Sequence, residues 1–173
     1  MTVKMGKIDM NTHSAKVLVE RFGTRDPFVI AKETGVNVMF SDKLKRLKGM
    51  YFLIKRNRFI VLNSKNSEQM NRIVCAHELG HDRPHREYAA DRALQEFMLY
   101  DMSTRREYEA NMFAAELLLD DEEILEYIRM GMDVFGIAAA TSTDINLVAL
   151  KVDCLINAGY RLRIQEHDDK FLK

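Results

Sequence analysis

The most informative stretch of this 173-residue sequence reads Ile73-Val74-Cys75-Ala76-His77-Glu78-Leu79-Gly80-His81. His77 and His81 are four residues apart, so a helix places them on one face, one turn apart. Their ring nitrogens can then reach a single Zn²⁺ at ~2.0–2.1 Å. Glu78 points to the neighbouring sector, where its carboxylate can reach a water on the metal and act as a general base. The pattern therefore predicts a metal site in which Glu78 is the catalytic residue.

A helix is predicted from about residue 67 to His81. Asn66 is placed to cap its start, and Gln69 stands at the position that completes a capping box. Pro84 disfavours helical backbone at the residue before it, so the helix should end just after His81. One apolar stripe of this helix also carries both histidines, which predicts that they point into the core. The stripe consists of Met70, Ile73, Val74, His77 and His81.

A catalytic zinc site keeps three protein ligands and one open position, so a third ligand is expected on a later helix. The segment 106–118 offers Glu107 and Glu109, which lie roughly 200° apart at ~3.6 residues per turn. Glu107 shares an apolar face of small residues, which should pack on the histidine helix, so Glu107 is the predicted ligand. Asn111, one turn further on the same face, could hydrogen-bond a ligand histidine. The other members of this face are Ala110, Ala114, Leu117 and Leu118.

The remaining pattern predicts an α+β fold, in which a small antiparallel sheet packs on a mainly helical domain. A strand over 36–40 and a hairpin over 50–62 follow two helices, and further helices follow the histidine helix. Apolar spacing between Tyr88 and Tyr100 also suggests a helix. We expect a catalytic domain over 1–130, and a helical hairpin with a tail over 131–173 on the same core. The predicted helices cover 12–21, 27–35, 67–81, 103–119 and 121–129, and a pair of helices lies within 133–158. Ser103 is the predicted cap of the helix over 103–119.

The segment 135–150 resembles a helix-turn-helix. A helix that reads DNA presents basic and amide side chains. Here the second helix offers Asn146 and Lys151, opposed by Asp144 and Asp153. The segment is therefore predicted to complete the core or contact a protein substrate, and direct DNA binding is not expected.

Charge and composition exclude several classes of protein. The chain has 26 basic and 26 acidic residues, so a whole-chain attraction to nucleic acid or anionic membranes is not indicated, although a local patch is possible. No apolar run approaches the ~20 residues that span a bilayer. Residues 1–10 show no apolar segment of a secretory signal, and Cys75 and Cys154 stand in apolar surroundings, so neither suggests a disulfide framework. A cytoplasmic location without membrane contact is the expectation.

Three features together resemble the ImmA/IrrE family of metallopeptidases: the histidine helix 73–81, His85 four residues later, and the segment Glu107-Tyr108-Glu109-Ala110-Asn111 with its helical continuation to Leu118. The resemblance covers roughly residues 12–160. It implies a zincin-like domain with His77, His81 and Glu107 as zinc ligands and Glu78 as the base. It also implies cleavage of a helix-turn-helix transcriptional repressor, as in prophages, mobile elements and stress regulons.

Alternatives remain open at this stage. His85 follows Pro84 and lies off the helix, so it could support the metal site, contact substrate, serve as an alternative ligand or be purely structural. The substrate is expected to bind extended along Met50–Ile54, because main-chain pairing holds a peptide with little demand on its side chains. A rival function is a non-catalytic zinc-containing regulator that binds a repressor or DNA, although Glu78 has no use there. A second rival is a toxin-like peptidase with another substrate.

Overall fold

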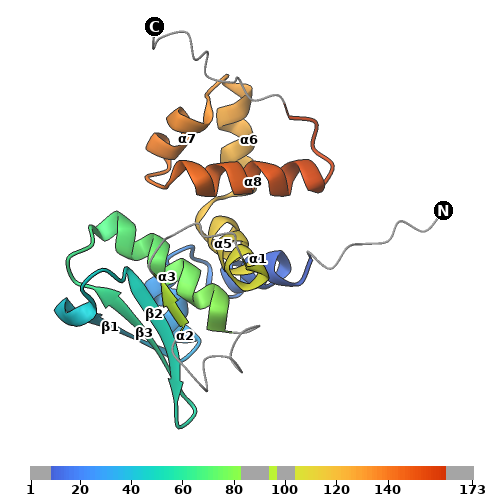
Figure 1. Ribbon diagram of the computed structural model, residues 1–173. Coiled ribbons are helices and arrows are strands. Elements are labelled where there is room, and N and C mark those ends of the chain that lie inside the picture. The colour runs from blue at the N-terminus through green and yellow to red at the C-terminus, as the bar shows by residue number, and fades with distance from the viewer. Residues whose placement is uncertain (1–8, 83–93, 97–103, 163–173) are drawn as a thin grey trace, which may run out of the picture. The chain divides into compact units, whose positions relative to one another are not determined.

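The computed structural model describes residues 9–82, 94–96 and 104–162. The chain divides into two compact units, Met1–Leu118 and Leu119–Lys173. Helices and a small sheet make up the first unit, which confirms the predicted α+β class (Figure 1). Its elements are α1 (Asp9–Phe22), α2 (Pro27–Glu33), β1 (Val36–Ser41), the 3₁₀ helix η1 (Asp42–Leu44), β2 (Gly49–Ile54), β3 (Asn57–Asn63), α3 (Glu68–Asp82), β4 (Leu94–Glu96) and α5 (Arg105–Leu118).

The sheet has the strand order β1-β3-β2-β4. β2 and β3 form the expected antiparallel hairpin, and its two-residue turn, Lys55-Arg56, has positive φ at both residues, as this tight turn type requires. β1, in contrast, runs parallel to β3, so the sheet is mixed rather than antiparallel throughout. The segment 42–48 connects β1 to β2, which are not neighbours in the sheet. β3 lies between them and pairs with both.

β4 was not anticipated from the sequence. Residues 94–96 form a strand that pairs antiparallel with Gly49–Tyr51, where apolar spacing had suggested a helix. The prediction of a helix at these three residues is wrong, because pairing with β2 is a tertiary contact that local spacing does not reveal. The proposed substrate edge is also affected, since the first half of β2 is already paired with β4.

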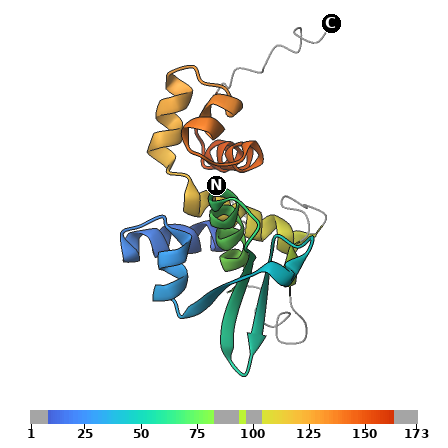
Figure 2. The same ribbon diagram turned by 90° about the vertical axis from the view of Figure 1, so that its left-hand side faces the viewer.

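α3 is the central element of the first unit. It contacts β2 and β3, and its other neighbours are α2 and α5 (Figures 1 and 2). Every residue from Ile73 to Asp82 is buried, so both histidines face the interior as predicted. The inner face of the sheet supplies the matching apolar layer, through Val36, Tyr51, Ile60 and Leu62. α1 packs against α5.

Gly80 allows α3 and α5 to approach closely. A Cβ at this position would lie 2.8 Å from Cα and 2.9 Å from the carbonyl oxygen of Ala110, which is closer than real Cβ contacts. Glu107 stands one helical turn before Ala110. The glycine within the histidine motif therefore brings the backbone of α5 near enough for a side chain of α5 to reach the histidines.

The ends of the helices follow local capping chemistry, with one correction to the predicted caps. Asp26 caps α2 as expected, with Pro27 at the first helical position. α3 is capped by Ser67, whose Oγ accepts a hydrogen bond from the Met70 amide at 3.1 Å, and not by Asn66. The side-chain NH2 of Asn66 donates to the carbonyl of Lys48, which ties the start of α3 to the segment before β2.

At α5, Thr104 Oγ1 accepts a hydrogen bond from the Glu107 amide, at 3.3 Å. The predicted cap, Ser103, lies outside the described residues.

The second unit contains α6 (Asp121–Arg129), α7 (Val134–Ala140) and α8 (Ile145–Asn157). α7 and α8 form the helix-turn-helix-like hairpin expected from the sequence. α6 belongs to the same compact unit. Lys151 of α8 is fully buried and pairs with Asp121 of α6, so this lysine is not available to DNA. No helix within the described ranges combines the length and apolar composition needed to cross a membrane.

Candidate metal centre

His77 and His81 face each other on consecutive turns of α3. Their ring centroids are 4.8 Å apart and the rings meet edge to face, at 82°. The two Nε2 atoms are 3.1 Å apart. Both side chains are almost fully buried. The helix thus presents two imidazole nitrogens to one point in the interior.

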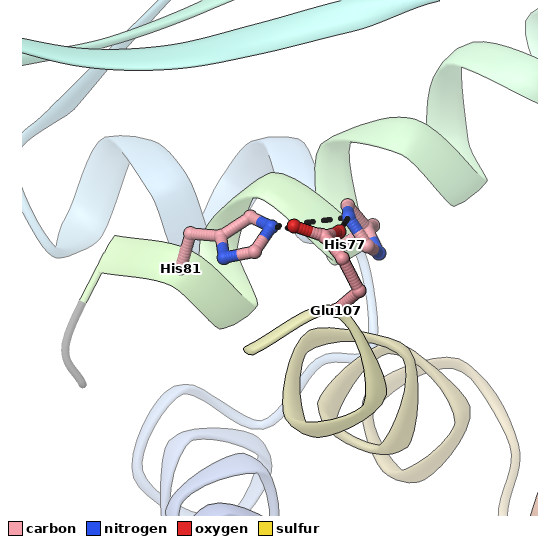
Figure 3. A group of neighbouring side chains, drawn as sticks. All are labelled: His77, His81 and Glu107. Atoms are coloured by element: carbon pink, nitrogen blue, oxygen red, sulfur yellow. Dashed lines mark hydrogen bonds and ion pairs between the residues drawn. The ribbon is translucent and has the colours of Figure 1, made fainter. Parts of the chain in front are cut away.

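Glu107 reaches that point from α5 (Figure 3). Its Oε2 lies 3.2 Å from Nε2 of His77 and 3.4 Å from Nε2 of His81. Burial alone would raise the pKa of the Glu107 carboxyl, but hydrogen bonding to the two histidines and their charge hold it well below its usual range. Glu107 is therefore an ionised carboxylate, as a metal ligand must be.

The three atoms form a nearly equilateral triangle that fits a tetrahedral metal ion. Metal–ligand bonds of ~2.0–2.1 Å require neighbouring ligands to be about 3.3 Å apart in a tetrahedron. The observed separations of 3.1, 3.2 and 3.4 Å match that value on all three sides. His77, His81 and Glu107 can therefore hold a metal ion and leave a fourth position open.

Asn111 fixes the state of one ligand. Its Oδ1 lies 2.9 Å from Nδ1 of His77, deep in the interior. Because an amide oxygen only accepts hydrogen bonds, Nδ1 of His77 must carry the proton and donate it. The Nε2 lone pair then points to the metal position, which is how supporting residues usually orient metal-bound histidines.

Glu78 lies outside the ligand triangle and against the sheet. Its side chain is 1% exposed. A Cβ at Gly49 of β2 would overlap Val74 and lie 3.2 Å from Oε1 of Glu78, so the absence of a side chain at Gly49 leaves room for this carboxylate. Glu78 is thus held next to the site without occupying a ligand position, which is the arrangement a general base requires.

Comparison with known proteins agrees with this geometry. Residues 31–141 match the model of the IrrE N-terminal-like domain of the M78 peptidases. The chain belongs to the ImmA/IrrE peptidase family. It is also 31% identical over 152 residues to a protein of Bacillus phage phi105 named "Uncharacterized immunity region protein 2", an alignment that spans 87% of this chain and 95% of that protein.

Within this ImmA/IrrE domain, the two neighbouring glutamates of α5 point in different directions. Glu107 contacts the histidines, whereas Glu109 pairs with Arg105 at 2.6 Å. Their side chains are similarly exposed, 23% and 25%, so direction and not burial separates them. Met112, Phe113 and Glu116, which share the face of Glu109, are buried, because α1 packs against α5.

Three further residues that the sequence analysis considered have different outcomes. His85 lies outside the described residues, so its place in the site stays a prediction. Cys75 is buried two residues before His77. Burial is the main cause that raises the pKa of its thiol, and the charges of Glu78 and Asp26 raise it further. It is therefore a packed neutral thiol and not a thiolate ligand. Cys154 is also a free cysteine.

Asp82 was missed in the sequence. This buried carboxylate, directly after His81, accepts a hydrogen bond from Tyr51 OH at 2.7 Å and from Arg58 at 2.8 Å. Arg58 also donates to the carbonyl of Thr34. These contacts tie the last turn of α3 to β2 and β3, so they hold His81 in place. Arg58 stands at an inward position of β3, opposite Leu53, and an inward arginine predicts a buried acidic partner.

Replacement of Asn111 by alanine is expected to weaken metal binding ~10–100-fold, because His77 loses the acceptor that sets its tautomer. Competition with a metal chelator measures the change. Asn111→Asp keeps the acceptor and should restore most of the affinity. Asn71→Ala removes another buried asparagine of the unit, which bonds to Asn66 and not to a histidine, and should leave the affinity unchanged. Equal affinity in Asn111→Ala and the wild type would show that His77 is oriented by other groups.

Proposed function

We propose that the chain is a zinc-dependent endopeptidase that cleaves a helix-turn-helix transcriptional repressor and so relieves repression. The observation that carries the proposal is the triangle of His77, His81 and Glu107 ligand atoms, with Glu78 buried beside it. Membership of a peptidase family supports the reaction class.

Zinc is the ion that this donor set favours. Two imidazole nitrogens and one carboxylate oxygen, with a fourth position open, are a known ligand set of catalytic zinc sites. Magnesium and calcium prefer oxygen ligands, and among the described residues the cluster contains two nitrogens and no thiolate. The identity of the ion is checked by elemental analysis of the purified chain.

The protein residues divide the work of peptide hydrolysis. Zinc, when bound, supplies Lewis acidity, which activates water near neutral pH and polarises the scissile carbonyl. A Glu78 carboxylate oxygen accepts the proton of the attacking water and transfers it to the leaving amine. His77 and His81, held by Asn111 and by the Asp82 contacts, keep the site rigid. Burial of Glu78 keeps the carboxylate away from bulk water.

The substrate assignment rests on family and context. The phage phi105 relative is described as a protein of an immunity region. Control of immunity by a phage depends on a repressor, and removal of such a repressor by proteolysis would release the genes it silences. This function places the chain in the cytoplasm with its target.

Two other functions remain as outcomes of the test. A non-catalytic regulator would hold the same metal and bind a repressor or DNA without cutting. Burial of Lys151 speaks against DNA binding through α8. A toxin-like peptidase would cut a different protein, and the site itself is compatible with that.

Incubation with a helix-turn-helix repressor encoded beside this chain is expected to produce discrete fragments of the repressor, which mass mapping locates. The zinc-loaded wild type should cut, and the same preparation with a chelator should not. An intact repressor that stays bound to the wild type would favour the regulator. An intact, unbound repressor together with cleavage of other proteins would favour the toxin-like peptidase.

A further inference from the structure

A group of exposed cations lies at one end of the sheet. The segment between β1 and β2 contains Lys43-Leu44-Lys45-Arg46-Leu47-Lys48, and Lys65 follows β3 at the same end, where β1 and β3 finish and β2 begins. We call Lys43, Lys45, Arg46, Lys48 and Lys65 the basic patch. All are exposed except Lys48, which is half-buried. Asp42 is the only acidic residue in 42–48.

The backbone of the basic patch is anchored to the rest of the unit. The Asn63 amide donates to the carbonyl of Leu47 at 2.9 Å, and the Asn66 amide donates to that of Lys48 at 2.9 Å. Lys48 also accepts a hydrogen bond from the Asn63 backbone amide. Leu47 is buried beneath the loop. The loop therefore displays its charges from a fixed position, which lowers the entropy lost when a partner binds.

The cations of the basic patch are not used within the folded unit. None of the five forms an ion pair within residues 9–82, 94–96 and 104–162. Two buried charged groups, in contrast, have ionic partners: Asp82 pairs with Arg58, and Lys151 pairs with Asp121. Five like charges at one end of the sheet repel one another, and an anionic partner would relieve that repulsion.

The patch adjoins the catalytic position. Lys48 directly precedes Gly49, and Gly49 lies against Oε1 of Glu78. Lys45 is four residues before Gly49, so its Cα can be no more than ~14 Å from that glycine. An extended peptide covers this distance with about four residues, at ~3.3 Å each. A polypeptide that is cut beside Glu78 can therefore reach the patch within a few residues of the cut.

We propose that the basic patch binds an acidic segment of the substrate polypeptide, within a few residues of the scissile bond. This proposal rests on the proposed peptidase function, because it places the acidic segment on a substrate. The position next to Glu78 favours a peptide over nucleic acid. The exposed face of α8, the second helix of the helix-turn-helix-like hairpin, carries no cation: it consists of Ile145, Asn146, Ala149, Asp153, Ile156 and Asn157.

Fluorescence anisotropy of labelled peptides tests the proposal through binding alone. The probes are three 12-residue peptides of one design, with four Glu, four Gln or four Lys, and a 20-base-pair DNA duplex. The protein is the full-length, zinc-loaded Glu78→Gln chain. We expect the Glu peptide to bind at least tenfold more tightly than the Gln peptide at 50 mM salt, and this preference to weaken at 200 mM salt.

Charge reversal identifies the residues responsible. In the background of the probe protein, Lys45→Glu with Arg46→Glu should weaken binding of the Glu peptide on the order of tenfold, because exposed charge pairs each contribute a small factor. The matched control is Lys55→Glu with Arg56→Glu in the β2–β3 turn. It makes the same charge change on exposed residues at the opposite end of the hairpin, and Lys55 has a positive φ close to that of Lys45, 48° and 50°. The control should bind the Glu peptide as the parent does.

The outcomes separate this inference from the proposed function. Equal binding of the Glu and Gln peptides, or equal loss in the two double variants, would overturn it. Tighter binding of the duplex than of the Glu peptide, lost only in the Lys45/Arg46 variant, would assign the patch to nucleic acid and overturn it as well. If the Glu peptide is preferred but the wild type hydrolyses no repressor, the inference about the basic patch holds and the proposed substrate is wrong. Thermal unfolding of both double variants checks that they fold.

Discussion

Glu78→Gln is expected to bind zinc as the wild type does and to lose ~10²–10⁴-fold in the rate of peptide hydrolysis. The side chain lies outside the triangle of ligand atoms, so its loss as a carboxylate removes no ligand. Glutamine has nearly the same shape and fits the space beside Gly49. Its amide, however, cannot accept a proton from water at neutral pH. The metal content and the cleavage rate of the same preparation are the two measurements.

The matched control for this change is Glu68→Gln. Glu68 lies at the start of the same helix but is exposed, so the substitution changes charge without touching the site. It should retain both metal and full activity. A Glu78→Gln chain that cleaves at the wild-type rate would show that another group takes the proton. Loss of metal in Glu78→Gln would instead mean that Glu78 is part of the coordination, contrary to the geometry.

The residues that surround the metal position were accessible from sequence because they depend on one local rule. Residues three, four or seven positions apart share a helix face, and this rule alone groups His77 with His81 and Glu107 with Asn111. The structure brings all four together. Helix spacing is set by the backbone and needs no knowledge of distant residues. The same rule placed both histidines on the buried side of α3.

The features that were missed depend on contacts between segments far apart in the chain. β4 is a strand because β2 offers its backbone groups, and the helical spacing around 94–96 gave no sign of this partner. β1 pairs in parallel with β3 because β3, the second strand of the hairpin, lies between β1 and β2. The sequences of the strands do not specify this order. Asp82 is meaningful only with Tyr51 and Arg58, which precede it by 31 and 24 residues. The cap of α3 was misplaced by one residue for a local reason: the helix begins at Glu68, so Ser67 and not Asn66 directly precedes it.

Glu107→Ala and Glu109→Ala are expected to differ sharply in zinc binding, although the two glutamates are two residues apart and similarly exposed. Glu107 supplies the only oxygen of the triangle, at 3.2 and 3.4 Å from the two histidine nitrogens. Its removal leaves two ligands, so zinc affinity should fall by more than the ~10–100-fold typical of a supporting residue, and cleavage should be abolished. Glu109 pairs with Arg105 on the helix surface, and such pairs contribute only about 0.3–0.5 kcal/mol.

Bound zinc, measured side by side in the two alanine variants under one chelator concentration, distinguishes the roles. Glu109→Ala should keep its metal and lose little stability, and it serves as the control for a loss of negative charge on α5. Glu107→Asp adds a stricter test, because it keeps the charge but withdraws the carboxylate by one methylene. If distance to the histidines governs binding, this variant should fall between the wild type and Glu107→Ala. Loss of zinc in Glu109→Ala with retention in Glu107→Ala would mean that α5 presents the other carboxylate when metal is bound. Asn111 would then lose its place beside His77 as well, since a rotation of α5 large enough to exchange the two glutamates would carry Asn111 away from the ring.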